Sequence, residues 1–216
     1  MPATAELRLF DSGRIRVASV VCSNPNVPPR VALPATERHP FFDGSNLDES
    51  TFWEIIESGL RRSKGDPDDA VEGIRSQLVG LQPAAIESFQ QLLNAKLNFA
   101  YSSNLWGAAY IINGGCSDDG FEYFRCWLIS RGRKIFDNAV ANPDSLADVV
   151  DRDESDEEHE AESLLYVARE AYEKVAGRQM ALAGRGHAPQ PTGEQWDFDD
   201  HTEASKRLPR LSSMYR

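Results

Sequence analysis

Cysteine is scarce in this chain of 216 residues, and long apolar runs are missing. The three cysteines, Cys22, Cys116 and Cys126, are odd in number and form no CxxC pair, which argues against a disulfide framework and a thiolate zinc site. The longest apolar stretch, residues 105–112, is far shorter than the roughly 18–20 residues that cross a bilayer. No basic segment followed by an apolar run opens the chain, so secretion is not expected. These features predict a soluble protein of the reducing cytoplasm without membrane association.

Positive charge is also in short supply. Lys and Arg number 23 against 34 Asp and Glu, which gives a formal net charge of −11 at pH 7. Because such a surface repels phosphate backbones and anionic bilayers, nucleic acid is not expected as a partner. Hydrophobic residues at 41% and charged residues at 26% are close to globular averages, so the chain can build a buried core.

Familiar catalytic motifs are absent as well. The sequence contains no P-loop, dinucleotide-binding fingerprint, GxSxG motif or HExxH motif. The commonest enzyme mechanisms therefore have no support in the sequence, and an enzymatic function would need an unfamiliar site.

The amino-terminal part of the chain has a pattern of its own. Polar and apolar residues alternate at 7–10 and 14–21 around Asp11-Ser12-Gly13, which predicts a short β-hairpin. Residues 24–40 hold five prolines and no helical period, as expected of an extended connector. We therefore expect residues 1–46 to form a β arm with a connector.

From Asp48 onward the spacing of apolar residues is that of helices. Helices are predicted from about 48, at 66–81, 83–101, 105–112, 121–130 and 133–141, with a last one ending near Gly177. The predicted fold class is mainly α: a helical bundle of about six or seven helices over 47–177, with a small N-terminal β arm and an irregular C-terminal tail. The tail, residues 178–216, is expected to dock on the helical domain through its aromatic residues.

The densest pattern in the chain spans residues 105–125 and reads LWGAAYIINGGCSDDGFEYFR. With Trp127-Leu128-Ile129 after it, Phe52-Trp53 before it and Asn142-Pro143 downstream, it resembles a bacterial family known only as domain of unknown function 4240. The resemblance covers about residues 48–177. What it implies is membership alone, because the family has no assigned activity, cofactor or site residue to carry over.

The centre of this pattern is the connection at residues 113–120. Asn113, Gly114 and Gly115 are predicted to stop a helix, since these residue types adopt the left-handed conformation that closes one. Ser117 or Asp119 is then expected to cap the next helix, and Glu122 would complete a capping box with Asp119. On this interpretation the loop is architecture.

The same loop offers two chemical alternatives. Cys116 would lie at a helix N-terminus, where a thiolate is stabilised, but the acids Asp118 and Asp119 oppose that effect. No histidine lies near it in sequence to act as the base that a nucleophile needs. Asp118 and Asp119 could instead hold a divalent cation such as Mg²⁺ or Ca²⁺, joined by Asn113 or by acids of the tail.

Aromatic residues surround the loop and suggest a third alternative, a ligand-lining pocket beside polar anchors. Trp106, Tyr110, Asn113, Asp118, Asp119 and Arg125 are the candidate ligand-binding residues, and Cys116, Asp118, Asp119 and Arg125 the candidate catalytic ones. Arg125 is expected to form a salt bridge with a carboxylate such as Asp119, or to face an anionic ligand. Trp196 to Asp200 of the tail could close this concavity. Packing in the core is the alternative role for the aromatic residues.

Negative charge is concentrated in residues 148–162, which hold nine acids and one arginine. Such a run is expected to be exposed and mobile. An interaction or regulatory module, with a protein or small-molecule partner, explains this segment together with the arm and the tail. The alternatives are an enzyme with an unrecognised site at residues 113–120, metal- or cysteine-dependent, and a purely structural subunit.

Overall fold

The protein is described from a computed structural model, which defines residues 4–11, 14–21, 46–63, 66–152, 159–181 and 190–215. Contacts divide the chain into two units, residues 1–41 and 42–216. In the first unit, β1 (Thr4–Asp11) pairs antiparallel with β2 (Arg14–Val21), with Asp11 opposite Arg14. The connector predicted at 24–40 lies outside the described residues.

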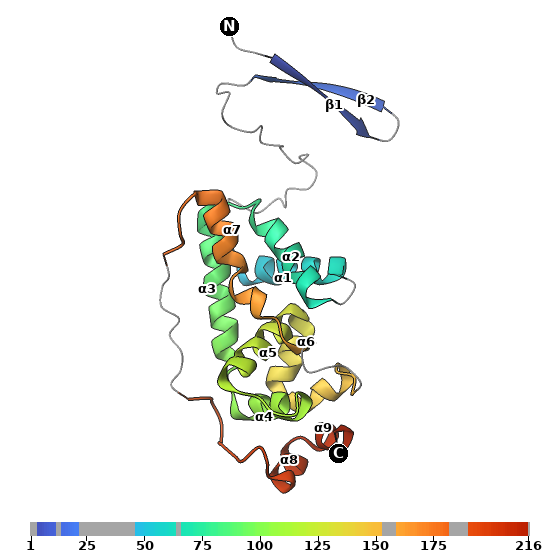
Figure 1. The fold of residues 1–216 in the computed structure, drawn as a ribbon, viewed down its shortest axis with the longest axis vertical. Coiled ribbons are helices and arrows are strands. Elements are labelled where there is room, and N and C mark those ends of the chain that lie inside the picture. Colours follow the sequence, from blue (N-terminus) through green and yellow to red (C-terminus); the bar gives the residue numbers. More distant parts are fainter. Residues whose placement is uncertain are drawn as a thin grey trace. The chain divides into compact units, whose positions relative to one another are not determined.

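The second unit is helical, which confirms the predicted fold class in its main part (Figure 1). Its α-helices are α1 (Glu49–Ser63), α2 (Pro67–Leu78), α3 (Pro83–Phe99), α4 (Ser103–Ile112), α5 (Asp118–Ser130), α6 (Arg133–Ala141), α7 (Val167–Ala176), α8 (His201–Arg207) and α9 (Pro209–Met214). Two 3-10 helices, η2 (Pro143–Asp148) and η4 (Glu162–Leu165), complete it. Helices α1 to α7 correspond to the segments expected from the sequence.

Local sequence signals explain where these helices begin and end. The side chain of Asp66 accepts a hydrogen bond from the Asp69 N–H at 2.8 Å and so caps α2. Pro67 and Pro83 stand at the first helical positions of α2 and α3, where their missing N–H has no cost. Gly177 ends α7 in the left-handed conformation, with φ of 66°.

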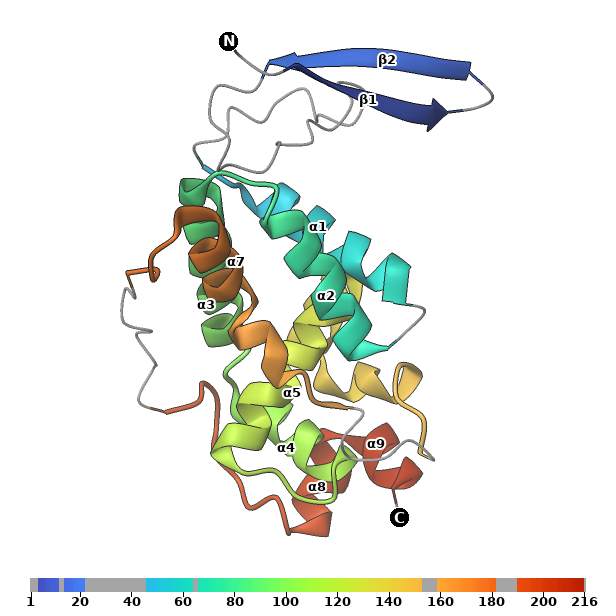
Figure 2. The same cartoon turned by 45° about the horizontal axis from the view of Figure 1, so that its top comes forward.

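The centre of the domain is α5. Every residue from Phe124 to Ser130 is buried, so this helix is covered on all sides rather than along one stripe. It contacts α1, α2, α3, α4 and α6, while α3 and α7 lie side by side along the domain (Figure 2). Helix α5 is therefore the most deeply packed element of the domain.

Helices α1 and α2 approach each other closely at a pair of glycines. A methyl group added at Gly59 would lie 2.6 Å from the carbonyl oxygen of Ala70 and 2.8 Å from Cγ1 of Ile74. One added at Gly73 would lie 3.0 Å from Gly59 Cα. The absence of side chains thus lets the two backbones pack at a distance that no other residue allows.

The expectation of an irregular tail is wrong in one respect, because the tail contains α8 and α9. Asp200 caps α8, and the carboxylate of Asp144 accepts hydrogen bonds from the Arg210 and Leu211 N–H groups at the start of α9. Apolar side chains are buried in both short helices and between them, namely Ala204 of α8, Leu211 of α9 and Leu208 at their junction. The two helices were missed because helices of six or seven residues show too little period to detect.

The expectation that residues 148–160 are wholly exposed is also wrong for the described part of that run. Val150 and His159 are buried, and the His159 ring lies edge-on to Trp127 at 5.0 Å between centroids. Ala161 is buried as well, and its N–H donates to the Tyr123 carbonyl at 3.2 Å. Residues 153–158 lie outside the described residues. Among the helices that the structure describes, none combines the length and apolarity needed to span a bilayer.

Candidate functional site

The connection between α4 and α5 has the tight geometry that its glycines predict. Gly114 and Gly115 both have positive φ, at 65° and 136°, so side chains there are strained although space is open around them. Ser117 Oγ accepts the Gly120 N–H at 3.1 Å and caps α5, which begins at Asp118. The cap is therefore Ser117 and not Asp119, and the expected capping box with Glu122 is not formed.

Arg125 points into the domain. It is 4% exposed and donates to the carbonyl oxygens of Leu97 at 2.7 Å and Phe121 at 3.2 Å. Its guanidinium carbon lies 4.8 Å from the ring centroids of both Tyr101 and Phe121. Asp119 is exposed, whereas these contacts of Arg125 are with backbone carbonyl oxygens and aromatic rings, and its pairing with a carboxylate or an anionic ligand stays a prediction.

Trp106 extends this stack toward the surface. Its ring lies parallel to Phe121, 5.0 Å away with an interplanar angle of 14°, and its Nε1 donates to the Cys116 carbonyl at 3.0 Å. Arg125, Phe121 and Trp106 thus form a continuous stack from the buried face of α5 to the outer face of α4. We call this stack, together with Tyr110 and Gly107 of α4, the α4 wall.

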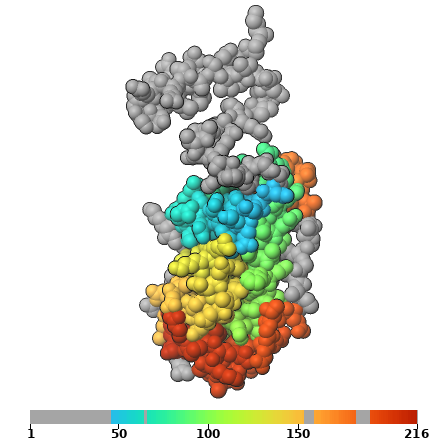
Figure 3. Space-filling view, turned by 180° about the vertical axis from the view of Figure 1, so that it is seen from behind, coloured from blue at the N-terminus to red at the C-terminus, as the bar shows by residue number. Residues whose placement is uncertain are grey.

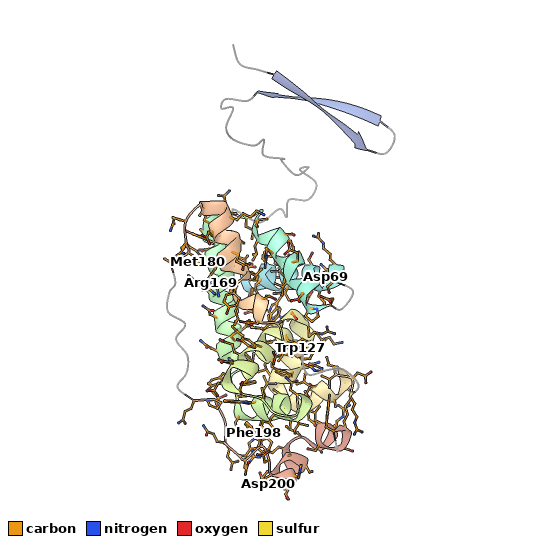
Figure 4. All side chains as sticks on the ribbon, in the orientation of Figure 1. Asp69, Trp127, Arg169, Met180, Phe198 and Asp200 are labelled. Atoms are coloured by element: carbon orange, nitrogen blue, oxygen red, sulfur yellow. The ribbon has the colours of Figure 1, made fainter. Side chains whose placement is uncertain are left out.

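The tail lies against the α4 wall. Phe198 contacts Trp106 at 6.0 Å and Tyr110 at 5.5 Å between ring centroids, and Asp199 Oδ1 accepts a hydrogen bond from the Tyr110 hydroxyl at 2.7 Å. Figure 4 labels Phe198 and Asp200 at this end of the domain, and Figure 3 shows the tail residues lying against the same end from behind. Two of the predicted ligand-binding residues, Trp106 and Tyr110, therefore touch a peptide segment of the chain itself.

Trp196 occupies a recess that exists because residue 107 is glycine. A methyl group added at Gly107 would lie 2.9 Å from Cη2 of Trp196 and closer still to Cζ2, so no side chain fits beneath the indole. The indole Nε1 donates to Asn104 Oδ1 at 3.2 Å, and the ring meets Phe198 edge-on at 4.9 Å. The sequence held a signal for this recess, since a glycine inside an apolar helix usually has a packing reason.

Contacts on either side of the aromatic residues extend the docking. Thr192 pairs with the start of α4 through two backbone hydrogen bonds, from its N–H to the Tyr101 carbonyl and from the Ser103 N–H to its own carbonyl, both 2.9 Å long. At the other end, Arg210 Nη1 donates to Asp148 Oδ2 at 2.9 Å, beside the Asp144 cap of α9. The Arg210 guanidinium holds the pKa of Asp148 below its usual value.

Cys116 is a poor candidate for a nucleophile. Burial, together with the negative charge of Glu160, raises the pKa of its thiol to about 12, and the positive charge of Arg125 only partly opposes this. At neutral pH the thiol is therefore protonated, whereas the thiolate is the reactive form.

The two acids at the start of α5 face solvent. Asp118 and Asp119 are exposed in its first turn, where their charge favours the helix N-terminus. In the described ranges, no three His, Cys, Asp or Glu side chains gather closely enough to hold a metal ion. Asn113 is buried at the carboxyl end of α4.

A second concavity, which the sequence did not indicate, lies along α7. It has a volume of about 260 Å³ and is lined by Tyr166, Arg169, Glu170, Glu173, Gln179 and Met180. Figure 4 shows Arg169 and Met180 close together there. Arg169 stacks on Tyr166 at 4.8 Å, and Glu170 pairs with Arg75 at 2.8 Å. Two charged side chains that line this concavity therefore already have partners within the domain.

Comparison with known families identifies the helical domain. A model of a family described as protein of unknown function, DUF4240, matches residues 47–174. The chain belongs to this family. Comparisons with curated proteins and with solved structures gave no match. The DUF4240 match includes all of α1 to α6, and therefore the whole α4 wall, whereas the tail that covers this wall follows the matched residues.

Proposed function

We propose that this chain is an interaction module with a regulatory role, and that its α4 wall binds a polypeptide segment. The observation that carries the proposal is the chain's own tail, which is seated on the wall through Trp196 in the recess at Gly107. A helical domain that accepts one segment of this kind has the chemistry to accept another.

The contacts on the wall are of the types used in peptide recognition. Thr192 pairs by backbone hydrogen bonds, which add affinity without reading sequence. Trp196 and Phe198 supply aromatic anchors, the residue class that dominates binding energy at interfaces. Asp199 supplies a hydrogen bond with defined geometry. Affinity and selectivity are thus divided between main chain and side chains.

The tail gives the proposed module its regulation. A segment tethered in the same chain acts at an effective concentration on the order of millimolar, so a partner segment must compete with it. Partner binding would release the tail and expose Trp196. In this proposal the module works in the cytoplasm, which the free thiols of Cys116 and Cys126 support, and the amino-terminal β arm is an appended element.

A peptide added in trans tests the proposal. The receptor is the full chain carrying Trp196→Ala and Phe198→Ala, and the probe is a dye-labelled peptide of residues 190–215, followed by fluorescence anisotropy. We expect saturable binding to this receptor and binding at least about tenfold weaker to the wild-type chain, because the resident tail competes. Far-UV circular dichroism verifies that both proteins are equally helical.

The matched control adds Gly107→Val to the receptor, which fills the recess without changing any charge. Binding should be lost in this control. Equal binding to the receptor, to the Gly107→Val control and to a scrambled peptide would contradict the proposal. If the double variant is not helical, Phe198→Ala alone serves as receptor.

The cysteine-dependent form of the enzyme alternative requires a reactive thiol at Cys116. Because the pKa of this thiol is raised to about 12, we expect its alkylation by iodoacetamide at pH 7.5 to be far slower in the folded chain than in the chain unfolded in urea. Mass spectrometry of the peptide containing Cys116 measures the rate, and Cys116→Ser identifies that peptide. Rapid alkylation in the folded chain would instead favour a cysteine-dependent site.

A further inference from the structure

We infer that the partner of the α4 wall is a linear segment of another protein that carries Trp, any residue, Phe and an acidic residue in sequence, as Trp196 to Asp199 do in the tail. The inference rests on the proposed function and specifies the chemistry of its ligand. Each position of the pattern follows from a separate contact with the wall.

The first position requires a large flat ring. The recess over Gly107 admits the indole edge of Trp196, and Asn104 Oδ1 accepts the indole N–H at 3.2 Å. Phenylalanine has no donor for Asn104, and an aliphatic side chain has neither the donor nor the flat shape. Tryptophan combines the flat ring with an N–H donor on the ring edge, which is the atom that meets Asn104 Oδ1.

The spacing of the two aromatic residues is set where the segment enters a turn at residues 197–200, closed by a hydrogen bond from the Asp200 N–H to the Asp197 carbonyl oxygen at 3.1 Å. Trp196 and Phe198 are both half-buried against the wall, while Asp197 between them is exposed. The two rings also meet edge-on at 4.9 Å. Inserting one residue between them would turn the second ring away from Trp106 and Tyr110.

The fourth position requires a carboxylate. Asp199 Oδ1 accepts the Tyr110 hydroxyl at 2.7 Å. The Asp199 N–H donates to Asp197 Oδ1 at 3.1 Å, a bond within the segment that involves no atom of the wall. Asparagine would keep one acceptor and lose the charge. Tyr110, predicted from the sequence as a ligand-binding residue, therefore donates the hydrogen bond that recognises this carboxylate.

The wall is built so that its occupant can be exchanged. Trp106 is held from behind by Phe121 and Arg125, which belong to α5 and touch the core, so the wall does not depend on the tail for support. The occupant, in contrast, leaves Trp196 and Phe198 only half-buried. A partner segment that covered them more fully would displace the tail.

Binding of short peptides to the receptor with Trp196→Ala and Phe198→Ala tests the pattern. The parent peptide covers residues 190–200, and variants replace its Trp or its Phe with Ala, insert Gly between Asp197 and Phe198, or replace Asp199 with Asn. Fluorescence anisotropy gives each dissociation constant. We expect the first three variants to bind at least about thirtyfold more weakly, and the Asn variant several-fold more weakly. Gln195→Ala, which alters an exposed position, should leave binding unchanged.

The outcomes separate the inference from the function on which it rests. If the 190–215 peptide binds but changes to Trp, Phe or their spacing have no effect, the pattern is overturned while the interaction module stands. If neither peptide binds in trans, both are overturned. If the wild-type chain forms dimers by exchanging tails, seen by light scattering over a concentration series, the occupant is a second copy and the inference of another protein is overturned.

Discussion

Gly59 and Gly107 both lie beneath close neighbours, and the neighbours differ. At Gly59 of α1 an added methyl group meets the Ala70 carbonyl oxygen, which belongs to the backbone of α2. At Gly107 of α4 it meets the Trp196 ring, which belongs to the tail. The α2 backbone can move only by separating two packed helices, whereas the tail can leave while the helices stay together.

The comparison shows that a glycine beneath a close neighbour can contribute either to the stability of the whole domain or to the docking of one segment. The contact at Gly59 is part of the cooperative core, so its loss affects the free energy of unfolding of the whole domain. The contact at Gly107 belongs to the tail, which is also held by the backbone pairing of Thr192, the Asp144 cap and the buried Leu208 and Leu211, so we expect its loss to loosen the tail and not to unfold the whole domain. Binding surfaces with exchangeable occupants have to be of the second kind.

The largest effect is expected for Gly59→Ala. Overpacking a buried contact typically costs about 1–3 kcal/mol, while alanine in place of glycine in a helix gains about 0.5–1 kcal/mol, so we expect a net loss of about 1–2 kcal/mol. Urea unfolding followed by circular dichroism measures it. A variant as stable as the wild type would mean that α1 and α2 adjust without loss, and the contrast between the two glycines would fail.

Gly107→Ala should instead release the tail. We expect trypsin to cut at Lys206, Arg207 and Arg210 much faster than in the wild type, because these sites lie in α8 and α9, while the urea midpoint of the helical domain changes little. Limited proteolysis with mass spectrometry follows the cleavage. Unchanged protection of the tail would show that Trp196 does not hold it.

In a Trp196→Ala background, Gly107→Ala should instead stabilise the folded protein. With the ring gone, the methyl group meets no clash, and only the gain in helix propensity, about 0.5–1 kcal/mol, is left. Stabilisation in this background together with tail release in the wild type separates the steric effect from the helical one. If Gly107→Ala destabilises the protein in both backgrounds, the loss of stability does not come from a clash with Trp196 but from another contact of α4.

The helical domain could be predicted because its signals are local. The apolar spacing of α3, the prolines that open α2 and α3, and Gly177 at the end of α7 each act within a few residues. The burial of α5 followed from apolar residues on several of its sides. Such features need no knowledge of distant parts of the chain.

The errors concern contacts between distant parts of the chain. Arg125 was expected to pair with a carboxylate such as Asp119 or to face an anionic ligand, and sequence spacing could not reveal that it donates to Leu97 of α3, 28 residues earlier. His159 lies in an acidic run, and its burial depends on Trp127 of α5. Trp106 and Tyr110 were predicted as ligand-binding residues, and sequence spacing could not reveal that Phe198 lies against them.

Two helix caps extend the comparison at a smaller scale. Asp66 caps α2 of the core and Asp144 caps α9 of the tail, and each loss of a cap costs about 0.5–2 kcal/mol. We expect Asp66→Ala to lower the urea midpoint of the whole domain. Asp144→Ala should instead speed hydrogen exchange in 209–214 and leave α3 unchanged. If Asp144→Ala also loosens α3, the tail is part of the cooperative core.

The smallest effect is expected from raising the pH. The hydrogen bond from the Tyr110 hydroxyl to Asp199, with burial and the charge of Asp197 adding to it, raises the pKa of Tyr110 above its usual value of 10. The neutral phenol is therefore favoured in the docked state, so the contribution of this contact is complete below pH 10 and is lost as the pH rises through the raised value. Absorbance at 295 nm reports the ionisation of Tyr110. Tryptic cleavage at Arg207 over the same pH range, corrected for the pH dependence of trypsin itself, reports the release of the tail.

Two variants serve as controls for this pH effect. Asp199→Asn should lower the pKa of Tyr110 toward 10 and weaken tail docking at neutral pH. If Tyr110→Phe retains tail protection at every pH, the carboxylate of Asp199 does not contribute to docking, and the aromatic residues alone hold the tail on the α4 wall.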